Sequence, residues 1–262
     1  MNDVSGSAEG TGTPPSRVRA EVVDGNVAVV TLADAERRNA LTLEMTNDLA
    51  AAVGWALAEG VGAIVLAADP PVFCAGGSVD DLLEPRADLP DMYAGFLAVA
   101  DAPVLTVAAV DGAAIGAGVN LPLACDVVLA SPTARFDPRF LDLGLHPGGG
   151  HLWRIERRMG RQAAAALVLG GDALDGAEAE AKGLAWRCVP SADLLDAALA
   201  MARRAASRPT GVMARAKATL DAGPGLATAD EAVALELDAQ RWSMAQPEFA
   251  ERLDDLRHRL GR

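Results

Sequence analysis

The chain has 262 residues, a hydrophobic fraction of 51% and a formal net charge of −13 at pH 7. A chain of this length can bury a substantial core, as one large domain with a small appendage. Nucleic acid is not an expected partner, because phosphate binding requires a basic surface. A membrane is not expected either, since no apolar run reaches the roughly 18 residues of a membrane span.

Residues 1–16 are rich in Gly, Ser, Thr and Pro and predict a disordered tail. This tail lacks a basic stretch followed by an apolar one, so the expected location is the cytoplasm. The elements predicted beyond it are strands at 18–24 and 26–32, a helix at 42–57, a strand at 61–67, a helix at 89–100, a strand at 104–110, a helix from about 117 and a strand at 127–130. The alternation predicts an α/β fold with a mostly parallel or mixed sheet.

The chain beyond Pro190 predicts helices almost throughout. Prolines separate the predicted helical segments, which cover 192–207, 211–221, 227–244 and 247–259. Leu235, Leu237 and Trp242 give these helices apolar faces. The pattern is equally consistent with packing on the chain's own core and with contact between copies.

Two glycine-rich turns are the most informative features of the chain. The segment Pro71–Leu82 (PVFCAGGSVDDL) and the segment Asp111–Asp126 (DGAAIGAGVNLPLACD) each follow an apolar run that predicts a buried strand. Two such turns can bring two free backbone N–H groups to one point. That geometry stabilises a developing oxyanion, and it needs small residues so that a substrate can approach the backbone.

At these residues the chain resembles the enoyl-CoA hydratase/isomerase family, also called the crotonase family. Five segments resemble the family's motifs in the family's order: RRNAL at 37–41, FCAGG at 73–77, IGAGVNLPLACDVVLAS at 115–131, LGLHPGGG at 143–150 and KGLAWRCVP at 182–190. The resemblance runs from about Val18 to the C-terminus. It implies a crotonase-type β-β-α spiral core over residues 17–200, followed by a C-terminal helical trimerisation region over 201–262.

The resemblance also implies an acyl-CoA-processing enzyme that forms a homotrimer or a dimer of trimers. The CoA thioester would be the substrate, and no separate cofactor is expected. The N–H groups of Gly77 and Ala117 would hold the thioester carbonyl oxygen. The residues implied to bind the substrate are Arg38, Ala40, Leu41, Ala75, Ser78, Val79, Asn120 and Phe140.

Two departures from the family concern its catalytic glutamates. Hydratases of the family use two glutamates, which supply basicity and donate a proton, so both must titrate. The matching positions here are Asn120 and Phe140. An amide can hold a water but cannot take or give a proton near neutral pH, and a phenyl ring has no acid or base capacity. Glutamate-pair hydration is therefore expected to be absent or very slow.

Other titratable residues lie close to the vacated positions. Asp142 and His146 follow the second one by two and six residues, and an imidazole changes charge near neutral pH. His151 stands at the expected start of a helix, where the neutral imidazole is favoured. The aspartates 80, 81 and 137 are expected to be solvated or to cap helices. The open alternatives are a thioester hydrolase or isomerase using His146 and Asp142, and a catalytically silent acyl-CoA-binding protein.

The three cysteines, Cys74, Cys125 and Cys188, lie in apolar or strand-like contexts. They have no metal-ligand spacing and no disulfide framework, so reduced thiols and no metal site are expected. Cys74 stands beside the first glycine turn but is expected to pack rather than to act as a nucleophile. A Rossmann-type dinucleotide site is excluded, because neither turn gives G-x-G-x-x-G followed by an acidic residue at the expected distance.

Overall fold

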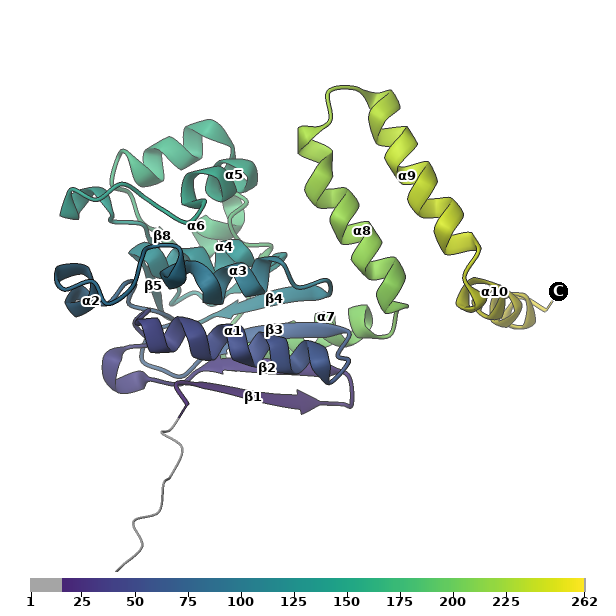
Figure 1. Cartoon of the computed structure of the whole chain (residues 1–262), viewed down its shortest axis with the longest axis horizontal. Helices are drawn as coiled ribbons and strands as arrows, with labels where there is room; N and C mark the ends of the chain where they lie inside the picture. The colour runs from purple at the N-terminus through teal and green to yellow at the C-terminus, as the bar shows by residue number, and fades with distance from the viewer. Residues whose placement is uncertain (1–15, 262) are drawn as a thin grey trace, which may run out of the picture.

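The computed structural model describes residues 16–261. The tail predicted over residues 1–16 therefore lies, except for its last residue, outside the described part of the chain. The described residues form a mixed α/β body, from which the last helices extend to one side (Figure 1).

The main sheet contains the strands that the sequence predicts. Its order is β1 (Val18–Val23), β2 (Val27–Leu32), β3 (Ala63–Ala68), β4 (Leu105–Val110), β6 (Val127–Ala130) and β9 (Arg187–Cys188). The first pair is antiparallel and every later pair is parallel. The mixed sheet expected from the sequence is thereby confirmed.

Helices cover both faces of this sheet, and the strand residues alternate between two apolar cores. Ile64 and Leu66 of β3 belong to the core that contains residues of α1 (Leu43–Ala58) and α3 (Ala94–Ala100). Their neighbours Ala63 and Val65 belong to the core beneath α7 (Ser191–Ala206). Since both faces are buried there, the central strands β2, β3 and β4 consist of nearly continuous apolar residues.

A second, small sheet stands beside the first and positions the site. Its order is β5 (Ala113–Ile115), β7 (Arg135–Asp137) and β8 (Leu174–Asp175). These strands have two or three residues each, which is too short for an alternating pattern to be recognised in the sequence. The turn at Gly112, with φ of 75°, separates β5 from the end of β4.

Further helices lie between the strands of the two sheets. They are η1 (Ala35–Arg37), α2 (Val79–Leu83), η2 (Asp91–Tyr93), η3 (Gly116–Val119), α4 (Asn120–Ala124), η4 (Leu141–Leu143), α5 (His151–Val168) and α6 (Gly176–Ala181). The helix predicted at 89–100 is instead η2 followed by α3. The helix predicted from 117 begins as η3 and continues as α4.

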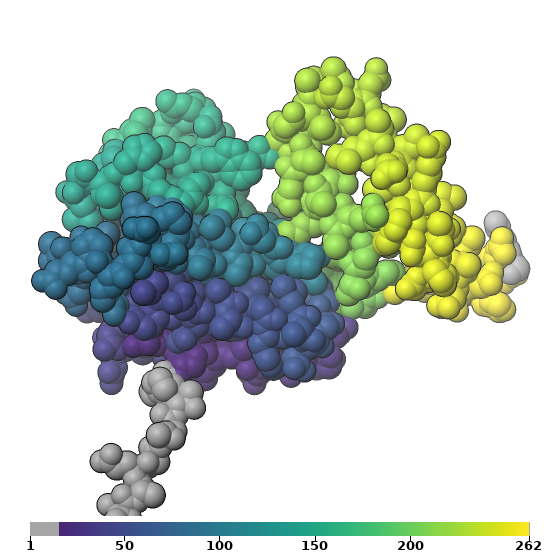
Figure 2. All heavy atoms as spheres, viewed as in Figure 1, coloured from purple at the N-terminus to yellow at the C-terminus, as the bar shows by residue number. Residues whose placement is uncertain are grey.

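The C-terminal helices leave the body after Ala206. The domain boundary expected at position 200 falls inside α7, whose Ala202 and Ala205 are buried against the sheet. The helices that follow are α8 (Thr210–Ala222), η5 (Gly223–Gly225), α9 (Ala229–Met244) and α10 (Pro247–Arg259). None of them contains a buried residue, and Figure 2 shows them as a lobe beside the body. No helix within residues 16–261 has both the length and the apolar composition that a membrane span requires.

Candidate functional site

Backbone hydrogen bonds join the two glycine-rich turns side by side. The Cys74 N–H donates to the Ala113 carbonyl at 3.0 Å, and the Ile115 N–H donates to the Cys74 carbonyl at 2.9 Å. These bonds make a parallel β-bridge between Cys74 and Ala114. The first turn is therefore paired with β5 at this point. Turns that lie about 40 residues apart in the chain thus meet at one place.

Close backbone contact at this junction requires glycine at two positions. A Cβ at Gly76 would lie 2.6 Å from the Ile115 carbonyl oxygen, and Gly76 has φ of 99°. A Cβ at Gly118 would lie 2.6 Å from the Cys74 carbonyl oxygen. Within residues 16–261, the N–H groups of Gly77 and Ala117 have no hydrogen-bond acceptor. Each turn therefore contributes a free donor at this junction, Gly77 in the first and Ala117 in the second.

The segment RRNAL packs against the first turn. The Ala75 N–H donates to the Arg38 carbonyl at 3.0 Å, and the Leu41 N–H donates to the Gly76 carbonyl at 2.7 Å. Asn39 is buried and donates through Nδ2 to the carbonyls of Asp69 and Val72. These bonds hold the loop in place, while the Arg38 side chain remains exposed.

A cavity of about 450 Å³ opens at the two free donors. Gly77, Ser78, Ala117 and Asn120 line it together with a large apolar surface. That surface comprises Leu41, Leu43, Leu82, Leu89, Met92, Tyr93, Phe96, Phe140 and Leu145. A concave, mostly apolar cavity with a few polar groups is typical of a small-molecule site.

The predicted site residues divide into two groups. The structure brings Leu41, Gly77, Ser78, Ala117, Asn120, Phe140 and His146 together around the cavity. Arg38, Ala40, Ala75, Val79 and Asp142 are not among the residues that line it. Met92 and Phe96 were not among the predicted site residues. They lie outside the recognisable motifs, Met92 in η2 and Phe96 in α3, and both elements line the cavity.

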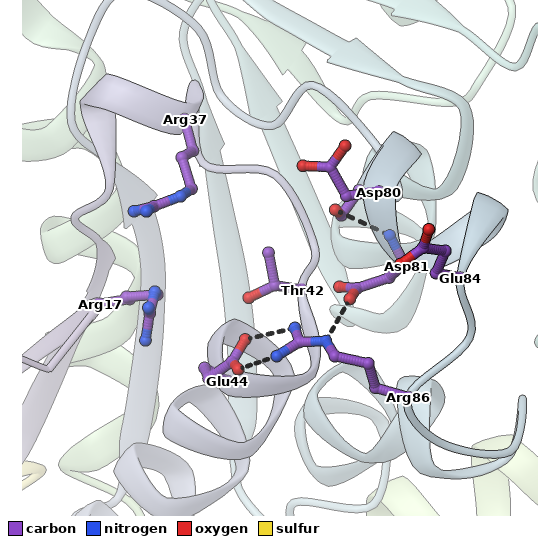
Figure 3. A pocket seen from close by; sticks show the side chains of 9 residues that line it. Arg17, Arg37, Thr42, Glu44, Asp80, Asp81, Glu84 and Arg86 are labelled. Atoms are coloured by element: carbon purple, nitrogen blue, oxygen red, sulfur yellow. Dashed lines mark hydrogen bonds and ion pairs between the residues drawn. The ribbon is translucent and has the colours of Figure 1, made fainter.

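A second cavity, of about 330 Å³, shares Ser78, Asp81 and Arg86 with the first and is mostly charged (Figure 3). Arg86 donates to both carboxylate oxygens of Glu44, at 2.6 and 3.0 Å, and to Oδ1 of Asp81 at 2.7 Å. The hydrogen bonds from Arg86 lower the pKa of Glu44 to about 2. Asp81 Oδ2 is buried without a partner in the described part of the chain. Arg86 thus ties the segment over the apolar cavity to α1 and α2.

The two positions that resemble the glutamate sites both contact His151. Asn120 is 2% exposed, and its Oδ1 lies 2.8 Å from His151 Nδ1. The Phe140 ring packs edge-on against the imidazole, with 5.1 Å between the ring centroids. Burial, with a further contribution from Arg154, lowers the pKa of His151 to about 4. The neutral imidazole predicted from the sequence is confirmed, with burial as the main physical cause.

His146 and Asp142 lie in different surroundings. Both are exposed, and only His146 lines the cavity. His146 Nδ1 lies 2.8 Å from the Pro147 carbonyl oxygen, which can only accept, so Nδ1 carries a proton. Asp142 belongs to η4, the turn that follows Phe140.

The thiol of Cys74 is buried beneath the junction of the turns. Burial raises its pKa to about 12, so the thiolate that a nucleophile requires is not populated at neutral pH. The prediction that Cys74 serves packing is confirmed. Across residues 16–261, no three His, Cys, Asp or Glu side chains are grouped in a way that could hold a metal ion.

Comparison with known proteins gives a consistent result. A family model described as enoyl-CoA hydratase/isomerase matches residues 23–255. A probable enoyl-CoA hydratase of Mycobacterium tuberculosis is 43% identical over 252 residues, covering 90% of this chain and 96% of the relative. One from Rhodobacter capsulatus is 36% identical over 211 residues, covering 79% and 81%. The solved structure of an enoyl-CoA hydratase from Polaromonas has a TM-score of 0.84 at 27% identity, covering 92% of this chain and 97% of that one.

Proposed function

Because the chain belongs to the enoyl-CoA hydratase/isomerase family, we propose that it binds acyl-CoA thioesters and polarises their carbonyl between the N–H groups of Gly77 and Ala117. The observation that carries this proposal is the pair of free donors at the mouth of an apolar cavity. Donors already fixed in place stabilise the negative charge that develops on the oxygen without reorganising during the reaction.

The proposed reaction is not glutamate-pair hydration. Asn120 and Phe140 line the cavity where the family resemblance places the two glutamates. Neither side chain can transfer a proton near neutral pH. The oxyanion donors could still serve other reactions of a thioester, because they act on the carbonyl and not on the double bond.

A second candidate is thioester hydrolysis or isomerisation through His146. The supporting observation is that His146 lines the same cavity as the free donors. With its Nδ1 proton directed at the Pro147 carbonyl, Nε2 is the nitrogen available as a base. This candidate and a silent acyl-CoA-binding protein differ in one respect, which is whether the bound thioester is chemically changed.

Isothermal titration with CoA thioesters of short, medium and long acyl chains tests the binding proposal. We expect the intact thioesters to bind. A mixture of free CoA and the matching carboxylate, which lacks the thioester bond, is expected not to bind. Absence of binding across the whole panel would overturn the proposal. Incubation of the bound thioesters, followed by mass analysis, then separates an enzyme from a silent binder.

We further propose that α8, α9 and α10 assemble the protein into a homotrimer or a dimer of trimers. These helices expose large apolar side chains, among them Leu220, Leu237, Met244 and Phe249. Apolar surface of this extent on helices without a buried residue favours contact with another copy. Light scattering coupled to size-exclusion chromatography measures the state, and a monomer would contradict it.

A further inference from the structure

Tyr93 brings a hydroxyl group to the wall of the apolar cavity. The residue is half-buried, and it lines the cavity together with Gly148. The hydroxyl oxygen lies so close to Gly148 that a Cβ on the glycine would come within 2.4 Å of it. No residue between 16 and 261 forms a hydrogen bond with this hydroxyl, and it is not enclosed as the unpartnered atoms Asp81 Oδ2 and His151 Nε2 are. The hydroxyl is therefore open to a ligand in the cavity.

The backbone on either side of Tyr93 is fixed by one buried side chain of α1. Thr46 Oγ1 donates to the Met92 carbonyl at 3.2 Å and accepts from the Gly95 N–H at 2.8 Å. The Tyr93 ring also packs against Phe96, with 5.4 Å between the ring centroids. The hydroxyl is thus held at the wall by contacts on both sides of it, as a group that transfers a proton must be.

The wall that Tyr93 contacts also carries His146. Both His146 and Gly148 line the cavity, and only Pro147 separates them. The Nδ1 proton of His146 is directed at the Pro147 carbonyl, so Nε2 is available as a base. A phenolic hydroxyl can give up a proton and take one back. One side of the cavity therefore offers both a base and an acid.

We propose that Tyr93 is the catalytic acid of this site, and that with His146 as the base it moves the double bond of a β,γ-unsaturated acyl-CoA to the α,β position. The inference rests on the proposed thioester site and selects isomerisation over hydrolysis. Removal of a proton and its return two carbons away on one face of the acyl chain need a base and an acid on one side. No water takes part, which suits a cavity whose wall is mostly apolar.

The proposed reaction consumes no other reactant. His146 Nε2 takes a proton from the α-carbon, and the electrons of that C–H bond form a dienolate whose oxygen accepts from the N–H groups of Gly77 and Ala117. The Tyr93 O–H bond then breaks, its proton forms the new C–H bond at the γ-carbon, and the double bond moves to the α,β position. The proton on His146 returns to the phenolate, so both residues regain their starting state.

Incubation of 3-hexenoyl-CoA with the protein in D₂O separates the acid from the base. The ultraviolet absorbance of the conjugated product follows conversion, and NMR follows deuterium exchange at the α-carbon of the substrate. Tyr93→Phe removes only the hydroxyl oxygen. We expect this variant to bind the thioester as the wild type does and to keep α-exchange, which needs the base alone. Its conversion rate is expected to fall by about 10²-fold or more, the usual contribution of a positioned acid.

His146→Ala is the matched comparison, because loss of the base is expected to abolish exchange and conversion together. Conversion at the wild-type rate by Tyr93→Phe would overturn the inference and leave the thioester site intact. Loss of α-exchange in Tyr93→Phe with binding retained would also overturn it, since the hydroxyl would then serve the base. A wild type that binds 3-hexenoyl-CoA without converting it would overturn it as well. Failure of the wild type to bind any thioester would reject the thioester site itself, and the inference with it.

Discussion

Gly118 packs directly against Cys74: a Cβ on the glycine would lie 2.6 Å from the Cys74 carbonyl oxygen and 3.0 Å from its Sγ. The carbonyl belongs to the backbone bridge that joins the two turns, so it cannot move without breaking that bridge. We expect Gly118→Ala to lower the free energy of unfolding by about 2 kcal/mol, as overpacking typically does. The same shift displaces the neighbouring Ala117 N–H, so acyl-CoA binding should weaken.

Gly54→Ala is the matched control for this substitution. Gly54 lies within α1, and a Cβ there meets nothing within 4 Å. Alanine is the better helix former, so a gain of roughly 0.5–1 kcal/mol is expected. Chemical denaturation measures both variants. Equal effects of the two alanines would show that the contact between the turns does not constrain the fold.

Hydration of crotonyl-CoA should be orders of magnitude slower than in an enzyme with both glutamates. A positioned acid or base contributes about 10²–10⁴-fold, and Asn120 and Phe140 supply neither. The assay follows loss of the ultraviolet absorbance of the enoyl thioester. A turnover equal to that of ordinary hydratases would show that another residue replaces the pair. Asp81 would be the first residue to examine, since its Oδ2 is buried and unpartnered in the described structure.

Any turnover of a thioester should depend on His146 more than on Asp142. His146 lines the cavity and Asp142 does not. We expect His146→Ala to retain acyl-CoA binding and to lose about 10²-fold or more in rate, the usual contribution of an acid or base. Asp142→Asn should differ little from the wild type. Full activity in both variants would make the segment structural and favour a silent binder.

Stability should fall at acidic pH because of His151. Its folded-state pKa is about 4, against 6.5 for an unperturbed histidine. Between these values the unfolded chain binds more protons than the folded one, so stability decreases as pH falls through this window. The whole effect approaches roughly 3 kcal/mol at about 1.4 kcal/mol per pKa unit. Urea denaturation of the wild type and of His151→Asn should diverge below pH 6.5, and parallel curves would contradict the assignment.

The main sheet and the helices on it could be predicted because burial and local hydrogen bonding leave periodic patterns. The apolar residues of β3 and of α7 are examples, and their predicted bounds agree with the structure within one or two residues. The strands of the small sheet could not be predicted in this way. They are too short for a period, and their pairing depends on segments far apart in the chain.

The candidate site shows the same division. The two turns and their small residues were recognisable in the sequence, because a free backbone donor requires particular residue types at particular spacings. Three other features of the site were not recognisable in the sequence. Side chains between Arg86 and Phe96 line the cavity, Asp142 does not, and His151 contacts both Asn120 and Phe140. Sequence patterns report the local backbone and its burial, whereas the packing of distant segments decides which side chains touch and which of them exclude water.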